Sequence, residues 1–97
     1  MAEKELEFEG DEAKAKLNLE KHGVSFFTAA AMFRNQRLER ADDREDYGEV
    51  RWIALGRAGL EIYRVTFTWK SENRIRIIGA QKANKKERQT YYGEIFP

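Results

Sequence analysis

The stretch that decides the fold is residues 50–79, VRWIALGRAGLEIYRVTFTWKSENRIRIIG. It holds three runs that are rich in β-branched and aromatic residues, and a short turn sequence separates each run from the next. This arrangement is typical of antiparallel strands joined by hairpins. We predict strands over 50–56, 63–69 and 74–79, with turns at 58–59 and 70–73.

The middle strand predicts which side of the sheet is buried, because successive side chains of a strand point to opposite faces. Tyr63, Val65, Phe67 and Trp69 should point one way and supply a core, whereas Arg64, Thr66 and Thr68 should point the other. Arg74 and Arg76 share one side of the last strand in the same manner. The sequence thus predicts a sheet with one apolar face and one polar, basic face.

Before this stretch, the sequence predicts a short edge strand and two helices. Residues 6–9 alternate apolar and acidic side chains and end at Gly10. Asp11 is a typical N-cap for a helix that runs to about Lys21 and ends at Gly23. Ser25 can cap a second helix to about 34–35, with Phe26, Ala29, Ala30 and Phe33 on its core face. A further short strand is expected near 38–41, followed by a loop that turns at Gly48.

After the stretch, Asn84 and Glu87 have the spacing of a capping box, which predicts a last helix from about Lys85 to Ile95. The predicted class is therefore α+β: an antiparallel meander of three or four strands, packed on one face against two N-terminal helices and one C-terminal helix.

Composition narrows the class of protein. The 97 residues are 41% hydrophobic, which is enough for a single domain spanning 1–97, with residues 1–5 expected to be disordered. Cysteine is absent, which excludes disulfides and thiolate metal sites. No apolar run reaches the roughly 18 residues of a membrane span and no signal-peptide pattern opens the chain, so we expect a cytoplasmic protein without a membrane partner.

The acidic cluster at 42–46, DDRED, raises the question of a metal site. Its carboxylates could bind a divalent cation, but the spacing is not that of an EF-hand and Arg44 lies in the middle. We favour a solvated loop, or a salt-bridge partner for the basic strand, and expect neither metal nor cofactor.

Charge is distributed unevenly along the chain. Residues 1–50 carry a net charge of −5, whereas residues 51–97 carry +6. A basic face of this kind usually meets nucleic acid, since arginine and lysine bind phosphates and aromatic side chains stack on bases. The alternative is an ordinary solvated sheet face. The residues that would form the basic surface are Arg51, Arg57, Arg64, Arg74, Arg76, Lys82, Lys85, Lys86 and Arg88, with Tyr63 or Tyr47 at the rim.

His22 is the one histidine, and histidine is the side chain best suited to move protons at neutral pH. It can act as a general acid or base. Its place at the end of the first predicted helix also suits a structural role, in which it interacts with the helix dipole and the last carbonyl groups. The sequence leaves both interpretations open.

Several motifs, in this order, resemble the BrnT family of toxins from bacterial type II toxin–antitoxin systems. The resemblance extends from about Leu6 to Tyr92. Among the segments that carry it are Lys21-His22-Gly23-Val24-x-Phe26, Asp43-Arg44-x-Asp46-Tyr47-Gly48-Glu49-x-Arg51 and Arg76-Ile77-Ile78-x-Ala80-x-Lys82-Ala83.

The resemblance implies a fold like that of RelE-type ribonucleases and metal-independent RNA cleavage, in which a ribose 2′-OH attacks the adjacent phosphorus and translation is inhibited. It also implies a cognate, BrnA-like antitoxin with a ribbon-helix-helix domain. That antitoxin would neutralise the toxin and bind operator DNA as part of the complex.

The resemblance also implies site residues. We expect phosphate contacts from Arg51, Arg76 and Lys82, and proton transfer by His22 or Tyr47. Further RNA contacts are expected from Lys21, Arg64, Arg74, Lys85 and Arg88.

Two positions depart from the family pattern. Gln81 stands where the family usually has an arginine, and Gly10 replaces an aromatic residue before Asp11. Losing a cation that stabilises transition-state charge commonly slows a reaction by orders of magnitude. An alternative is therefore a catalytically weakened or inactive member that acts as an antitoxin-binding or RNA-binding module.

Overall fold

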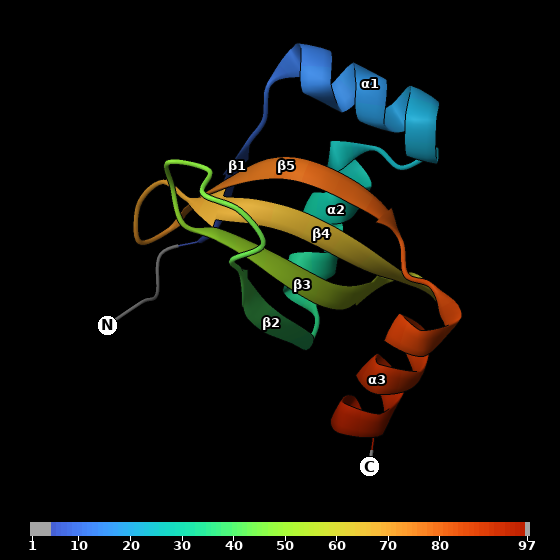
Figure 1. The fold of residues 1–97 in the computed structure, drawn as a ribbon. Helices are drawn as coiled ribbons and strands as arrows, with labels where there is room; N and C mark the ends of the chain where they lie inside the picture. Colours follow the sequence, from blue (N-terminus) through green and yellow to red (C-terminus); the bar gives the residue numbers. More distant parts are fainter. Residues whose placement is uncertain (1–4, 97) are drawn as a thin grey trace.

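The computed structural model describes residues 5–96 and has the expected α+β class. Five strands form one sheet in the order β1-β5-β4-β3-β2 (Figure 1). The prediction of disorder for residues 1–5 falls, except for Glu5, outside the described residues. In chain order the elements are β1 (Glu7–Glu9), α1 (Glu12–His22), α2 (Phe26–Ala31), the 3₁₀ helix η1 (Met32–Arg34), β2 (Arg37–Asp42), β3 (Arg51–Ala58), β4 (Glu61–Trp69), β5 (Arg74–Lys82) and α3 (Lys85–Ile95).

The sheet is mixed, whereas an antiparallel meander was predicted. Strands β2 to β5 are antiparallel to their neighbours, but β1 pairs in parallel with β5, placing Glu7 beside Arg74 and Glu9 beside Arg76. A parallel partner needs a long crossover connection, and here the whole chain between β1 and β5 supplies it.

The last strand continues to Lys82, whereas the sequence predicted its end at Gly79. Gly79 pairs with Thr66, while the next residue of β4, Phe67, pairs with Ile77, so Ile78 is an extra residue in β5. Such a bulge shifts the alternation of side chains along a strand. Arg76 and Gln81 therefore share one face, and Lys82 points to the other.

One face of the sheet packs against α2 and η1 and forms the main core, which includes the fully buried Met32 and Phe67. The rings of Phe33 and Phe67 meet edge to face with their centroids 5.0 Å apart, a favourable aromatic geometry. Gly56 in β3 is needed here, because a Cβ atom at this position would lie 2.2 Å from Sδ of Met32. The predicted core face of the middle strand is thus confirmed for Tyr63, Val65 and Phe67, whereas Trp69, at the end of β4, is exposed.

Helix α1 lies along the part of β5 that extends beyond β1 (Figure 1). Asn18, the one buried residue of α1, donates from Nδ2 to the carbonyl oxygens of Ala80 (2.8 Å) and Val24 (2.9 Å), and its Oδ1 accepts from the Ala80 N–H (3.1 Å). The amide therefore satisfies backbone groups of β5 as a neighbouring strand would.

Helix α3 packs on the opposite face of the sheet, whereas all three helices were predicted on one face. It covers a second, smaller apolar cluster formed by Ile62, Ala83 and Tyr91, with Leu38, Leu55 and Ile95 packed around it. The Tyr91 hydroxyl donates to the Gln36 carbonyl (2.9 Å) and fixes the helix against the start of β2. Between α1 and α3 this second face remains uncovered by helix (Figure 1).

No helix within residues 5–96 combines the length and apolar character that a membrane-spanning helix requires.

Candidate functional site

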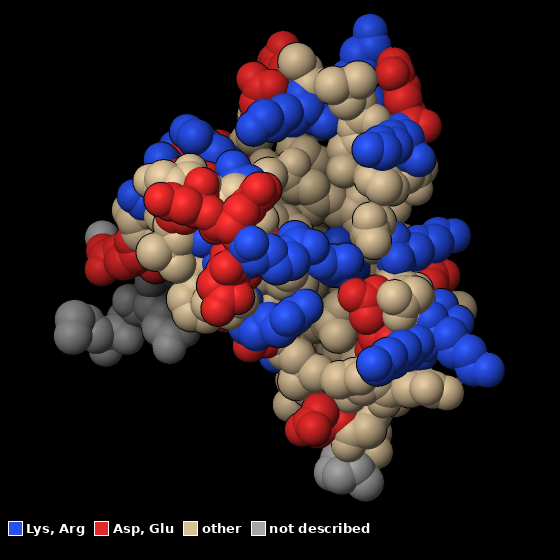
Figure 2. Space-filling view, in the orientation of Figure 1, with Lys and Arg blue, Asp and Glu red and all other residues tan. Residues whose placement is uncertain are grey.

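The uncovered part of the sheet holds a small cavity of about 210 Å³. Lysine and arginine side chains gather across the middle of this face, between α1 and α3 (Figure 2). The cavity is lined by Asn18, His22, Arg44, Arg64, Thr66, Gly79, Ala80 and Gln81. It therefore brings together the one histidine, two arginines from distant parts of the chain, and Gln81.

His22 is the last residue of α1, and its side chain lines the cavity. The helix ends there because Gly23 adopts a left-handed conformation (φ 69°) and donates its N–H to the Leu19 carbonyl (2.9 Å). The imidazole is exposed and also borders an open depression on the α1 side, which Lys21 lines as well. His22 thus lies both at the helix end and at the rim of the cavity.

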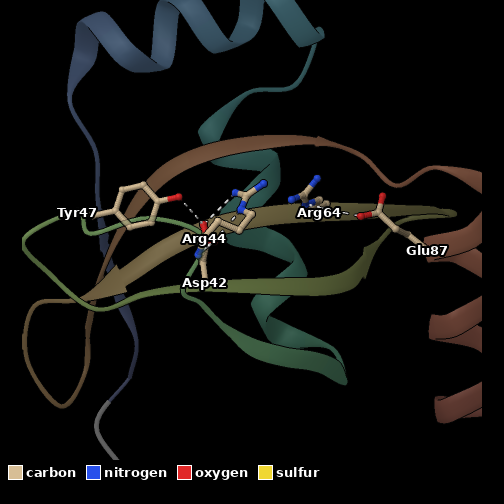
Figure 3. Close-up of polar contacts among 5 residues, drawn as sticks. All are labelled: Asp42, Arg44, Tyr47, Arg64 and Glu87. Carbon is tan, nitrogen blue, oxygen red and sulfur yellow. Dashed lines mark hydrogen bonds and ion pairs between the residues drawn. The ribbon is translucent and has the colours of Figure 1, made fainter.

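Arg44 is held in place by Asp42, the last residue of β2. Arg44 donates from Nε (2.7 Å) and Nη2 (2.9 Å) to the two carboxylate oxygens (Figure 3). The Asp42 side chain is only 1% exposed, whereas that of Arg44 is 59% exposed. These hydrogen bonds from Arg44 lower the pKa of Asp42 to about 2. The buried carboxylate of this acidic loop therefore binds an arginine of the same loop, rather than the basic strand.

Arg64 lies in the middle of the sheet, on β4, and its Nε edge faces Glu87 in the first turn of α3 (Figure 3). Its Nε lies 3.6 Å from Oε2 of Glu87, which is an ion pair but too long for a hydrogen bond. This Nε is buried and has no hydrogen-bond partner among residues 5–96. The other oxygen of Glu87 accepts from the Asn84 N–H (2.9 Å), so the predicted capping box of α3 is confirmed and also places a carboxylate beside Arg64.

Tyr47 and Arg51 form a separate pair next to the cavity. The Arg51 guanidinium lies 4.2 Å from the centre of the Tyr47 ring and its Nε is 3.2 Å from Glu49. The Tyr47 hydroxyl donates to Asp42 Oδ2 (3.3 Å). Tyr63, the other aromatic residue predicted for the rim, points to the opposite face and packs against the main core.

Arg74 and Arg76 lie on the polar face but at its β1 end, where glutamates offset their charge. Arg76 lies 2.9 Å from Glu9, and Arg74 lies 2.6 Å from Glu7 and 3.9 Å from Glu9. Neither arginine lines the cavity.

The remaining predicted contact residues surround the α3 end of the sheet. Lys82 is exposed at the end of β5, on the opposite face from Arg64, because of the bulge. Arg88 donates to the Ala83 carbonyl (2.9 Å), and Lys85 is exposed in the first turn of α3. The sequence therefore predicted more cations for one site than the fold brings together.

Arg44 is the cavity residue that sequence reasoning missed. Its place within DDRED indicated a solvated loop, and it was given no site role although it lies in a segment that carries the family resemblance. A second signal is that Arg44 follows a strand-ending aspartate by two residues. The departure at Gly10 has a packing explanation, because a Cβ there would lie 2.8 Å from Cδ2 of Phe26. The Phe26 ring already fills the space beside this position, and neither residue lines the cavity.

Comparison with known proteins adds three findings. A family model described as "Ribonuclease toxin, BrnT, of type II toxin-antitoxin system" matches residues 11–87. The 1.1 Å crystal structure of the Brucella abortus ribonuclease toxin BrnT is similar in fold, with a TM-score of 0.61 and 23% sequence identity over 82% of this chain and 99% of that chain. No curated protein sequence gives a significant match.

Proposed function

Because the chain belongs to the BrnT family of ribonuclease toxins from type II toxin–antitoxin systems, we propose that it cleaves RNA at the cavity between α1 and α3. The observation that carries this proposal is that a single cavity joins His22 to Arg44 and Arg64 on the open, basic face of the sheet. These are the residue types that phosphodiester cleavage requires, namely a group that transfers protons and cations beside the phosphate.

In the proposed reaction the ribose 2′-oxygen attacks the adjacent phosphorus. The 2′-OH proton passes to a base, the new O–P bond forms, the bond from phosphorus to the 5′-oxygen breaks, and that oxygen takes up a proton. The products are a 2′,3′-cyclic phosphate and a 5′-OH end. His22 is the candidate for proton transfer, since the Tyr47 hydroxyl already donates to Asp42. Arg44 and Arg64 stabilise the charge on the phosphoryl oxygens.

Membership of this family supports a proposed biological setting. We propose that the chain is a cytoplasmic toxin that inhibits translation, and that a cognate antitoxin, with a BrnA-like ribbon-helix-helix domain that binds operator DNA, neutralises it. The basic residues around the cavity, among them Lys21, Arg51 and Lys85, extend the RNA contact beyond the reacting phosphate. Arg74, Arg76 and Arg88 lie further out, where they would contact neighbouring phosphates. Lys82 points to the opposite face of the sheet, so it would contact only RNA that continues around the end of β5.

The proposal is tested by purifying the chain and measuring cleavage of RNA, alongside growth arrest on induced expression. We expect His22→Ala and Arg44→Ala each to slow cleavage by about 100-fold, the size expected for loss of a proton-transfer group or a charge-stabilising donor. Tyr47→Phe should retain most of the activity. The matched control is Arg34→Ala, which removes an exposed arginine of η1 on the other side of the sheet.

Retention of full cleavage and growth arrest by both His22→Ala and Tyr47→Phe would rule out the proposed proton-transfer roles. Equal losses in Arg34→Ala and Arg44→Ala would show that the cavity is not the site.

A second candidate function is favoured by Gln81, the neutral side chain that lines the cavity where the family usually has a cation. In that case the chain binds antitoxin or RNA but cleaves slowly or not at all. Tight binding to a ribbon-helix-helix partner with no RNA cleavage by the folded wild-type chain would support this candidate.

A further inference from the structure

We propose that Asp42 and Glu87 are positioning residues that hold Arg44 and Arg64 on two sides of one phosphate group. The proposal rests on the proposed function, because it assigns a task to two residues that do not themselves touch RNA. We refer to Arg44 and Arg64 as the arginine pair. Each member of the pair meets a carboxylate from its own flank of the cavity, and the two carboxylates come from opposite ends of the polar face (Figure 3).

The first carboxylate fixes the direction of Arg44. Asp42 is almost completely buried and accepts from both Nε and Nη2, so it determines the plane of the guanidinium. A two-point contact of this kind restrains an arginine far more than a single contact does. Because the bulk of the Arg44 side chain is exposed, this contact is what keeps its remaining N–H groups at the cavity.

The second carboxylate restrains Arg64 in a different way. Glu87 meets only the Nε edge, at 3.6 Å, and forms no hydrogen bond with it. The Nη groups are therefore left for a ligand. Glu87 is itself fixed, since its Oε1 accepts from the Asn84 N–H and its own N–H donates to Asn84 Oδ1. The start of α3 thus holds the carboxylate, and the carboxylate holds the arginine by charge.

The size of the cavity indicates what the arginine pair would bind. At about 210 Å³ it is smaller than the sites of about 300–1,000 Å³ that enclose a whole small molecule. One phosphate of a longer chain fits such a site, with its sugars and bases outside. Arginine presents several N–H groups in a plane that matches phosphate oxygens, so two arginines on one phosphate would share its charge between them.

The proposal can be tested without cleavage, by following the Nε–Hε signals of Arg44 and Arg64 by NMR while inorganic phosphate is added. In the wild-type chain both signals should shift with one shared dissociation constant. In Asp42→Asn the affinity should fall by about tenfold, the size expected when a charge-assisted hydrogen bond is lost. Glu87→Gln should weaken binding in the same way, although glutamine still completes the capping box.

The direction of the change in phosphate affinity distinguishes a positioning role from a simple effect of charge. Removing a negative charge near an anion site should by itself strengthen anion binding, whereas loss of a positioning residue should weaken it. Glu45→Gln is the matched control, because Glu45 is an exposed carboxylate of the same loop. It should leave phosphate binding unchanged or slightly tighter. In an Arg44→Ala background, Asp42→Asn should not change the dissociation constant for phosphate any further. In an Arg64→Ala background, the same should hold for Glu87→Gln.

In RNA cleavage, Asp42→Asn and Glu87→Gln should lower kcat more than they raise KM. The melting temperature of each variant is measured as well, so that a loss of folded protein is not counted as a loss of kcat. Phosphate binding by Asp42→Asn that matches Glu45→Gln, or different dissociation constants for the two arginine signals, would overturn the proposal. If the wild-type chain cuts no RNA but both signals titrate together, the proposed function fails and the arginine pair stands. If it cuts RNA and the two signals do not titrate together, the proposed function stands and the arginine pair fails.

Discussion

At the scale of single residues, Asp42 joins Arg44 and Tyr47 beside the cavity. Its carboxylate accepts two hydrogen bonds from the Arg44 guanidinium and one from the Tyr47 hydroxyl. Burying a carboxylate is unfavourable unless donors replace the water that it loses, and these donors do so. The contacts hold the pKa of Asp42 near 2 and raise the pKa of Arg44.

This lowered pKa leads to a prediction about acid stability. The carboxyl group titrates near 3.9 when unfolded and near 2 when folded, so its ionised form stabilises the fold at pH values above about 4. That contribution should disappear as the pH falls from 4 to 2. Denaturant unfolding across this range should show a smaller decline in stability for Asp42→Asn than for the wild type, whereas Asp43→Asn should follow the wild type. Parallel curves for wild type and Asp42→Asn would contradict the assignment.

Gln81 carries the second residue-scale prediction. It lies directly opposite Arg64 in the sheet and lines the cavity. Gln81→Arg should raise the rate of RNA cleavage by about tenfold or more, because it adds a cation beside the phosphate. It should also destabilise the fold by up to about 1 kcal/mol, since two like charges would face each other across the strands. Gln89→Arg, on the exposed side of α3, is the control for added charge. An unchanged rate would show that Gln81 does not limit catalysis.

At the scale of elements, the helix starts could be predicted from sequence because caps are local. The end of the second helix could not, because α2 stops at Ala31 and η1 continues to Arg34, where the sequence predicted one helix to about 34–35. Asp11, Ser25 and Asn84 cap the three helices as expected, and Gly23 ends the first in the left-handed conformation. The bulge at Ile78 could not be predicted, because it depends on how β5 pairs with β4. Because of this one extra residue, Lys82 lies on the other face of the sheet and Gln81 lines the cavity. The cations that the sequence predicted for one surface are therefore divided between the two faces.

Helix α1 carries the element-scale prediction. Asn18 is its one buried side chain and joins it to the backbone of β5 at Ala80. Asn18→Ala should lower the free energy of unfolding by about 1–3 kcal/mol, because buried backbone groups lose their partner. The rate of RNA cleavage should fall by a larger factor than the fraction of folded protein, because the same helix positions His22. The control is Leu17→Ala, whose side chain is 62% exposed. Chemical denaturation and activity assays measure both effects, and equal stabilities of the two variants would contradict this role.

At the scale of the whole molecule, the sequence predicted the class of the fold and the charge of the open face, and it failed on which cations meet. The α+β class and the apolar side of β4 followed from local alternation. The parallel pairing of β1 with β5 and the placement of α3 on the second face did not, because they join residues that are far apart in the chain. Arg44 and Arg64 reach one cavity for the same reason, so spacing in sequence gave no sign of them as a pair.

The capping of α3 by Asn84 and Glu87 has a consequence for the order in which the protein is made. Chains leave the ribosome N-terminus first, at about 5–20 residues per second, and domains fold as their parts emerge. Glu87 lies in α3, which follows the last strand, so the carboxylate beside Arg64 emerges after all five strands. A product cut short before this point would contain all five strands and still lack half of the support for its arginines. If the cavity cuts RNA, a nascent chain becomes a competent enzyme only after α3 has followed the whole sheet out of the ribosome.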